Sequence, residues 1–385
     1  MIPYGRQDIT QEDIDSVVDV LESDFLTQGP KVPEFETAIK DYCGVAHALA
    51  VNSATSALHV ACLALEVGPG DEVWTSPITF VASANCARYC GATVDFVDID
   101  PRTYNLSAEA LEDKLKLRKS AGETLPSVVI PVHMGGQSCD MAAIRDLGDE
   151  FGFRIIEDAS HAIGGRYRDE PIGNCRYSDI TVFSFHPVKI ITTGEGGVAT
   201  TGDAALAQKM ALFRSHGQTR DPSQLTRPAD GAWYYEQIEL GYNYRMTDMQ
   251  AALGCSQMLR LDKQVAARHQ IADRYDAELA TLPLVLPRRE HFGYSAFHLY
   301  IVLLDGAAAA ERTAVFESLR KRGIGVNVHY IPVHTQPYYR QLGFKFGDFP
   351  RAEDYYARAL SIPLYPTLTQ AQQDEVITAL TSELS

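Results

Sequence analysis

One lysine in the stretch FSFHPVKIITTGEGG, residues 183–197, lies in an unusual setting. Lys189 is flanked by a Pro-Val pair and two isoleucines, and it is the only lysine between Lys119 and Lys209. A lysine among apolar neighbours loses hydration, which lowers its pKa toward neutrality, and a neutral amine is the nucleophile of Schiff-base chemistry. The alternative is a lysine with a buried stem and an ammonium group in solvent. Ser184, five residues earlier, offers a hydroxyl to a phosphate.

A second candidate lies in VNSATSAL, residues 51–58, where an apolar strand ends and small polar residues open a helix. The N–H groups of a first helical turn are unpaired and carry partial positive charge. They can therefore bind a phosphate, and small side chains let the anion approach. Ser53, Thr55 and Ser56 meet this description. The competing interpretation is that Asn52 or Ser53 simply caps the helix.

Two carboxylates end the apolar strand in RIIEDASHA, residues 154–162. Glu157 and Asp158 stand at its carboxyl end, where open α/β sheets bind ligands. A carboxylate here can hold a protonated ring nitrogen, ligate a metal or cap the next turn. His161 is close, but no second carboxylate and histidine follow at ligand spacing. We therefore expect no metal site.

The segment GYNYRMTDMQAALG, residues 241–254, places polar residues just before a long helical pattern. Asn243 and Arg245 precede Thr247, which is a suitable N-cap. These polar residues either form the entry to that helix or face a ligand site.

Three of these features have one explanation in common. A phosphate cradle, a strand-end aspartate and a lysine with apolar neighbours, in this order on a parallel sheet, are the parts that bind pyridoxal 5′-phosphate (PLP). Asp158 would keep the pyridine nitrogen protonated, which makes the ring an electron sink. Lys189 would hold the cofactor aldehyde covalently as an imine. We therefore predict a PLP enzyme.

The elements that must position these residues alternate along the chain. Val/Ile/Phe-rich runs are separated by amphipathic helical segments, which is typical of a mainly parallel sheet covered on both faces. The predicted strands are residues 47–52, 71–76, 93–100, 127–133, 154–160, 179–185 and 197–201. The predicted helices between them are residues 53–65, 79–91, 107–117 and 141–152.

The two ends of the chain have other patterns. Helices are predicted over residues 10–23, with Thr10 as N-cap, and over residues 32–43, ended by Gly44. A long helical stretch, residues 246–282, could connect two domains. The elements predicted after it are a strand (297–304), a helix (311–323), a strand (324–330) and a terminal helix (369–382).

Length and composition limit the class of protein. The 385 residues, 45% hydrophobic and 22% charged, are typical of a globular enzyme with two domains. The net charge of −16, with no basic block, argues against nucleic acid as a partner. Seven scattered cysteines without a C-x-x-C motif indicate free thiols in a reducing compartment. No signal peptide or long apolar run is present, so we expect a soluble, cytoplasmic protein with no membrane partner.

Six spaced blocks resemble the DegT/StrS-type nucleotide-sugar aminotransferases, which are PLP enzymes of fold type I. The blocks cover nearly the whole chain: LTQGPKVPEFE, NSATSALHVA, SPITFVASAN, EDASHAIG, FSFHPVKIITTGEGG and GYNYRMTDMQAALG. The resemblance implies an α/β fold with a large PLP-binding domain, residues 1–258, built on a mainly parallel sheet of the seven-stranded type. It also implies a smaller C-terminal α+β domain, residues 259–385, and a homodimer whose subunits share the active site.

The resemblance also implies the substrates. MIPYGRQDI, SDFLTQGP, HPVKIITT and FRSHG are most similar to a family member that acts on a UDP-linked 4-keto-6-deoxy-N-acetyl sugar. That sugar is the implied amino acceptor, and L-glutamate is the implied donor. Relatives that remove a sugar hydroxyl carry histidine in place of the lysine, so Lys189 favours transamination.

The cofactor site is implied residue by residue. Lys189 is the implied catalytic residue, which holds PLP and moves the proton, and Asp158 pairs with the ring nitrogen. Phe80 occupies the place of an aromatic ring stacked on the cofactor, and His161 lies beside the cofactor ring or its hydroxyl. The implied phosphate ligands are Ala54, Thr55, Ser184 and, from the neighbouring subunit, Asn243.

The sugar-nucleotide site is implied in three segments of the chain. Its residues are Tyr4, Asp24, Phe25, Leu26, Thr27, Asn327, Val328, His329 and Tyr330.

Other functions fit the sequence less well. An aminotransferase for a different keto nucleotide sugar, or for a keto-inositol, is the nearest alternative. A PLP-binding regulator is disfavoured by the acidic charge. A Rossmann oxidoreductase needs a glycine-rich turn after the first strand, whereas GEGGV follows residue 190.

Overall fold

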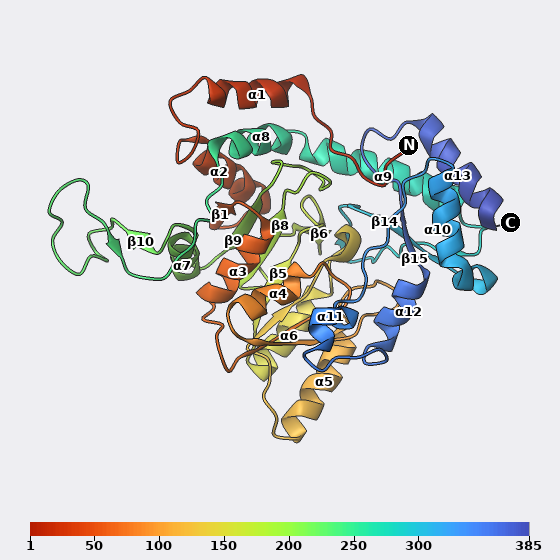
Figure 1. The fold of residues 1–385 in the computed structure, drawn as a ribbon, viewed down its shortest axis with the longest axis horizontal. Coiled ribbons are helices and arrows are strands. Elements are labelled where there is room, and N and C mark those ends of the chain that lie inside the picture. Colours follow the sequence, from red (N-terminus) through yellow and green to blue (C-terminus); the bar gives the residue numbers. More distant parts are fainter. Residues whose placement is uncertain (385) are drawn as a thin grey trace.

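The computed structural model describes residues 1–384, with a seven-stranded sheet at its centre (Figure 1). The strand order is β1-β9-β8-β5-β4-β2-β3. Strand β9 runs antiparallel to both neighbours, and the other adjacent pairs are parallel. The mainly parallel α/β sheet predicted from the sequence is therefore confirmed. The strands are β1 (His47–Val51), β2 (Glu72–Thr75), β3 (Thr93–Phe96), β4 (Val128–Ile130), β5 (Arg154–Asp158), β8 (Ile180–Ser184) and β9 (Gly197–Thr201).

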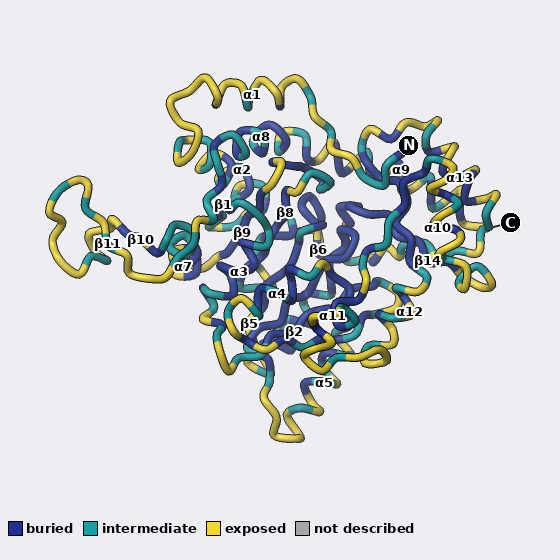
Figure 2. The backbone as a smooth tube through the Cα atoms, in the orientation of Figure 1, coloured by how far each residue is buried: buried dark blue, intermediate teal, exposed yellow. Residues whose placement is uncertain are grey.

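Helices cover both faces of this sheet. Helices α3, α4 and α7 pack on one face, against strand residues such as Ile180 and Val182. Helices α2, α5, α6 and α8 cover the other face, where Phe183 packs. Because alternate strand residues point to opposite faces, β8 is buried along its whole length, and the centre of the chain trace is dark in Figure 2. The helices are α2 (Lys31–Cys43), α3 (Ala54–Ala64), α4 (Ala82–Tyr89), α5 (Ala108–Ser120), α6 (Met141–Phe151), α7 (Ala204–Arg214) and α8 (Asp248–Met258).

The C-terminal part of the chain has its own antiparallel sheet and its own apolar core. The sheet has the order β12-β14-β15, and helices α9, α10 and α13 pack beside it, on the right of Figure 1. The domain boundary placed after residue 258 remains a prediction. The elements are β12 (Leu284–Val285), β14 (Tyr300–Leu304), β15 (Ala359–Ile362), α9 (Leu261–Glu278), α10 (Arg312–Lys321), α11 (Pro337–Arg340), α12 (Pro350–Arg358) and α13 (Gln370–Leu384).

Short elements complete the fold. The β10–β11 hairpin projects from the body, on the left of Figure 1. None of the helices within residues 1–384 is both long and apolar enough to cross a lipid bilayer. The remaining elements are α1 (Gln11–Leu21), β6 (Arg166–Tyr167), β7 (Glu170–Pro171), β10 (Gln218–Thr219), β11 (Glu236–Gln237), β13 (Gly293–Tyr294), and the 3₁₀ turns η1 (Met134–Gly136), η2 (Gly306–Glu311) and η3 (Val333–Thr335).

The structure corrects two predicted elements. The stretch 246–282 is two helices, because Arg260 leaves the helical conformation and bonds the N-terminal segment through Asp13. Residues 324–330 do not form a sheet strand, since this segment makes only isolated bridges on its way to a cavity described below. Strand β15 takes the sheet position instead, and its four residues gave no strand signal.

A buried carboxylate fastens α1 to α8. Asp13 has no exposed surface, and although burial alone would raise its pKa, hydrogen bonds from Arg260 and Ser256 hold that pKa below its ordinary value. Stability from this group is therefore present at neutral pH and is lost as the pH falls through the lowered pKa. Its partners are the Thr10 backbone N–H (2.9 Å), Ser256 Oγ (2.6 Å), Gln257 Nε2 (2.7 Å) and Arg260 Nη2 (2.9 Å).

Asp13→Ala is expected to lower the free energy of unfolding by ~3 kcal/mol, because it leaves the partly buried Arg260 without its carboxylate. Urea titration at pH 7 measures the change. Asp15→Ala is the matched control, since Asp15 is exposed on the same helix and bonds only Gln11. Equal losses in the two variants would show that the buried network does not fasten α1.

Candidate active site

A cavity of about 950 Å³ opens at the carboxyl ends of the parallel strands. Strands β1, β5 and β8 all end at it, as expected for an open α/β sheet. It brings together residues from distant parts of the chain that the sequence had marked. These are Tyr4, Asn52, Ser53, Ala54, Thr55, Ser56, Phe80, Asp158, His161, Ser184, Lys189, Asn327, Val328, His329 and Tyr330.

The structure does not bring five other marked residues into this cavity. For the segment 24–27, the reason is a backbone anchor: the Asp248 N–H donates to Leu26 O, and its carboxylate accepts from the N–H groups of Gly29 and Lys31. Asn243 pairs with Ser215 in an isolated bridge. The five residues are Asp24, Phe25, Leu26, Thr27 and Asn243, and their roles remain predictions.

Lys189 is half-buried in the cavity wall, just after β8. Burial lowers its pKa from the ordinary value to about 8, even though the charge of Asp158 acts in the opposite direction. A substantial fraction of the amine is therefore neutral near physiological pH. This is the property that the apolar neighbours of Lys189 predicted.

Asp158 is held in place by two hydrogen bonds. Its Oδ2 accepts from Ser83 Oγ at 2.6 Å, and its Oδ1 accepts from the Ser160 N–H at 3.1 Å. The carboxylate is buried but still lines the cavity. It can therefore accept one further hydrogen bond from a ligand in a fixed direction.

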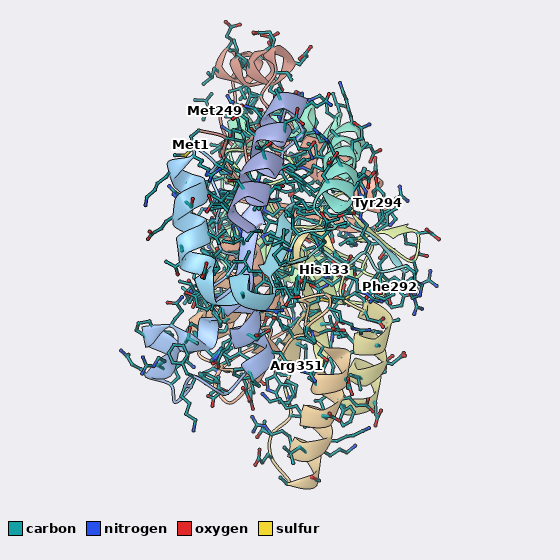
Figure 3. All side chains as sticks on the ribbon, turned by 90° about the vertical axis from the view of Figure 1, so that its right-hand side faces the viewer. Met1, His133, Met249, Phe292, Tyr294 and Arg351 are labelled. Carbon is teal, nitrogen blue, oxygen red and sulfur yellow. The ribbon has the colours of Figure 1, made fainter. Side chains whose placement is uncertain are left out.

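Glu157, the neighbouring candidate, turns to the other face of β5 because strand side chains alternate. It accepts a hydrogen bond from His133 Nε2 at 2.8 Å and another from Ser178 Oγ at 2.5 Å. His133 lies in the middle of the molecule in Figure 3 and has no exposed surface. The backbone N–H of His133 also donates to the backbone carbonyl of Asp158. The His133–Glu157 pair therefore stabilises the carboxyl end of β5. Only Asp158 is left to meet a ligand.

The first turn of α3 serves as both cap and cradle. Ser53 Oγ accepts from the Ser56 N–H at 3.1 Å, so the N-cap interpretation is correct. The N–H groups of Ala54 and Thr55 come too early in the helix for an intrahelical partner, and both residues line the cavity. Ser184 lines it as well. The cap therefore leaves donors free for an anion.

The glycines after Lys189 explain how this turn of α3 is placed. A Cβ on Gly197 would lie 2.5 Å from the Ala54 nitrogen and 2.5 Å from the Ser53 carbonyl carbon. Gly194 has a φ of +79°, which favours glycine. The close approach of β9 to α3 thus requires glycine at position 197.

Gly197→Ala is expected to weaken PLP binding ~10-fold or more, because the added methyl must displace the α3 turn at a cost of about 1–3 kcal/mol. Fluorescence titration of the cofactor-free chain with PLP measures the Kd. Gly202→Ala is the control, since nothing lies within 4 Å of a Cβ there. An unchanged Kd in Gly197→Ala would show that glycine at position 197 is not needed for PLP binding at the α3 turn.

Three of the four histidines that line the cavity are buried. Burial lowers the pKa of His161 and His298 well below the ordinary value and that of His329 to about 3, and the charge of Lys189 adds to each effect. All three rings are therefore neutral near physiological pH. They can donate or accept hydrogen bonds without placing a fixed positive charge beside the amine.

Sequence reasoning missed several cavity residues. Ser83 and Ser160 orient Asp158, and the ring of His298 lies tilted against that of His161 with ring centroids 4.4 Å apart. Their polar side chains are the only sequence signal that could have identified them as cavity residues. The other missed residues are Thr79, His186, Glu195 and Gln250.

The residues present fit PLP. The site offers an amine of lowered pKa, a buried carboxylate with a free acceptor position, and a helix N-terminus with Ser184 for a phosphate. Phe80, 59% exposed, presents its ring at the cavity. These residues have the chemistry needed to bind the aldehyde, the ring nitrogen, the phosphate and the ring face.

Comparisons with known proteins identify the family of the chain. The model of the DegT/DnrJ/EryC1/StrS aminotransferase family matches residues 7–381. The spore coat polysaccharide biosynthesis protein SpsC of Bacillus subtilis is 42% identical over 383 residues, covering 98% of this chain and 96% of SpsC.

Solved structures extend the agreement to the fold. Helicobacter pylori PseC, an aminotransferase involved in the biosynthesis of pseudoaminic acid, superposes with a TM-score of 0.91 at 31% identity, covering 100% of this chain and 99% of PseC. Spr1654 of Streptococcus pneumoniae, solved in its PLP form, superposes with a TM-score of 0.88 at 32% identity over 100% of both chains.

Proposed function

The chain belongs to the DegT/DnrJ/EryC1/StrS aminotransferase family, and from this premise we propose its substrates. As a member it is a PLP-dependent sugar aminotransferase. We propose that it moves the amino group of L-glutamate to C4 of UDP-2-acetamido-2,6-dideoxy-β-L-arabino-hex-4-ulose. The product would be UDP-4-amino-4,6-dideoxy-N-acetyl-β-L-altrosamine, an amino sugar for pseudaminic acid.

One observation carries this proposal. The residues that fit PLP and the residues that resemble a sugar-nucleotide site line the same cavity, so Lys189 and Asp158 face Tyr4 and the segment 327–330. A cavity of about 950 Å³ is at the upper end of the range for small-molecule sites and has room for a cofactor beside a substrate. The similarity to PseC over the full chain supports the choice of sugar.

The residues of the chain have separate tasks in the proposed reaction. When bound, PLP supplies an electron sink for the carbon that gains or loses the amine and carries the amino group between the two substrates. Lys189 would anchor the cofactor, and its neutral amine would take the proton from the donor carbon and later return one to C4. Asp158 would keep the ring nitrogen protonated, and the N–H groups of the α3 turn would hold the phosphate.

We propose a homodimer in which each subunit completes the other's site. The support is that Asn243 and the segment 24–27 resemble site residues but lie outside the cavity of their own chain. Phe25 and Leu26 are 55% and 47% exposed, which is costly for apolar side chains unless another surface covers them. We also propose a cytoplasmic location, in keeping with seven cysteines that are all free.

A panel of UDP-linked 4-keto-6-deoxy-N-acetyl sugars tests the proposed acceptor. The PLP-loaded protein is incubated with L-glutamate and each sugar, and NMR assigns the configuration of the amine at C4. The β-L-arabino ketone is expected to react fastest and to give the altro product. Preference for another sugar of the panel would replace this acceptor while leaving the family unchanged.

A further inference from the structure

A chain of hydrogen bonds runs from the backbone of η1 into the substrate part of the cavity. The Gly135 N–H donates to His161 Nδ1 at 3.3 Å, and His161 Nε2 lies 3.1 Å from the Tyr330 hydroxyl. Gly135 is itself fixed, because Leu299 N–H donates to its carbonyl at 3.2 Å. His161 is buried, with only 5% of its surface exposed. The three groups therefore form an ordered relay.

The direction of each hydrogen bond follows from Gly135. A backbone N–H can only donate, so His161 Nδ1 must accept and carries no proton. Burial lowers the pKa of His161 well below its ordinary value, so the ring is neutral and its one proton is on Nε2. Nε2 then donates to the oxygen of Tyr330. The hydroxyl proton of Tyr330 is directed away from His161 and remains available.

The Tyr330 hydroxyl makes no other hydrogen bond within the part of the chain that the structure describes. Burial raises its pKa, so the hydroxyl stays protonated. The residue is half-buried and lines the cavity together with Lys189, and its ring lies 6.3 Å from that of Phe80. A half-buried hydroxyl that lines the cavity and has no acceptor among the described residues is free to donate to an oxygen of a ligand.

We propose that Tyr330 is a catalytic residue that donates its hydroxyl proton to the carbonyl oxygen of the keto sugar, with His161 as the residue that positions it. This inference rests on the proposed function. When C4 exchanges its double bond to oxygen for a bond to nitrogen, the oxygen leaves as water with the two hydrogens that the nitrogen loses. Tyr330 gives one proton to the oxygen and regains one from the nitrogen, so atoms and protons balance.

The test compares single-turnover rates of amine transfer to whichever UDP-keto sugar the wild-type protein aminates. Tyr330→Phe is expected to lower this rate ~10²–10⁴-fold, the contribution of a positioned general acid, with the Kd for UDP changed less than ~3-fold. Tyr339→Phe is the matched control, since it also loses a buried tyrosine hydrogen bond, to Asn85, away from the cavity. A Tyr330→Phe rate within ~3-fold of wild type would overturn the proposal.

Two further readouts separate catalysis from a structural role. ¹⁵N NMR of histidine side chains in the cofactor-free protein is expected to show His161 as the Nε2–H tautomer, and an Nδ1–H or charged ring would overturn the relay. The His161→Ala/Tyr330→Phe double variant, compared at full PLP occupancy, is expected to have the same single-turnover rate as Tyr330→Phe alone. The reason is that His161 acts only by positioning the hydroxyl that Tyr330→Phe has already removed. Additive losses would contradict the positioning role.

The outcomes also distinguish this inference from the proposed function. If the wild-type protein aminates a UDP-keto sugar and Tyr330→Phe keeps the rate, only the role of Tyr330 fails. If the wild-type protein aminates none of the sugars, the proposed function fails and the inference fails with it.

Discussion

Lys189→Ala is expected to lower kcat by ~10⁴-fold or more, the largest effect of any single substitution in this chain. The change removes the amine that anchors PLP and the base that moves the proton, and no other lysine lines the cavity. Steady-state assays and the absorbance of bound PLP measure the two losses. Lys209→Ala is the control, because Lys209 is an exposed lysine of α7 paired with Glu66.

The same lysine sets a pH dependence. Its pKa is lowered to about 8, so below that pH most of the amine is protonated and cannot attack the cofactor aldehyde. The rate at which the cofactor-free protein captures PLP covalently is expected to rise with pH and to level off above about 8. Stopped-flow absorbance across this range measures it. Covalent PLP in purified Lys189→Ala, or a capture rate that does not change with pH, would contradict the assignment.

Asp158→Asn is expected to lower kcat ~100-fold or more. Asparagine retains the size of the side chain but loses the charge that keeps a proton on the ring nitrogen. Ser83→Ala provides a graded comparison, since it leaves the carboxylate in place and removes the 2.6 Å hydrogen bond to Oδ2, together with the bonds of the hydroxyl to Thr79 Oγ1 and Phe80 O. The kcat of Ser83→Ala is expected to fall ~10-fold, the cost of losing one hydrogen bond to a charged group.

Kinetics of the two variants, with PLP occupancy checked by absorbance, measure these effects. If Asp158→Asn keeps wild-type kcat at full occupancy, the ring nitrogen does not depend on this carboxylate. If Ser83→Ala is as damaged as Asp158→Asn, the serine has a role beyond orienting the carboxylate.

The central sheet could be predicted from the sequence because its signals are local. The strands of the large sheet are short apolar runs, and those from β1 to β5 alternate with helices. Ligand residues at the carboxyl ends of such strands must share one edge. Lys189, Asp158 and the α3 turn therefore meet as expected, although more than 130 residues separate the first from the last.

Other features depend on contacts that no local pattern encodes. Ser83 meets Asp158 across 75 residues of sequence, and His133 meets Glu157 across 24, so neither pairing could be read from spacing. Strand β15 was missed because four residues after a helix resemble a loop. The sequence could likewise not show that the backbone of the segment 24–27 is tied to Asp248, outside the cavity of its own chain.

Transfer of ¹⁵N from labelled L-glutamate is the decisive test of the proposed amino transfer to C4 of the keto sugar. The PLP-loaded protein is mixed with labelled glutamate and UDP-2-acetamido-2,6-dideoxy-β-L-arabino-hex-4-ulose, and ¹H–¹⁵N NMR follows the label. We expect ¹⁵N on C4 of the sugar with the wild-type protein and none there with Lys189→Ala. Label that stays in glutamate with the wild-type protein, or that reaches C4 equally well without Lys189, would contradict it.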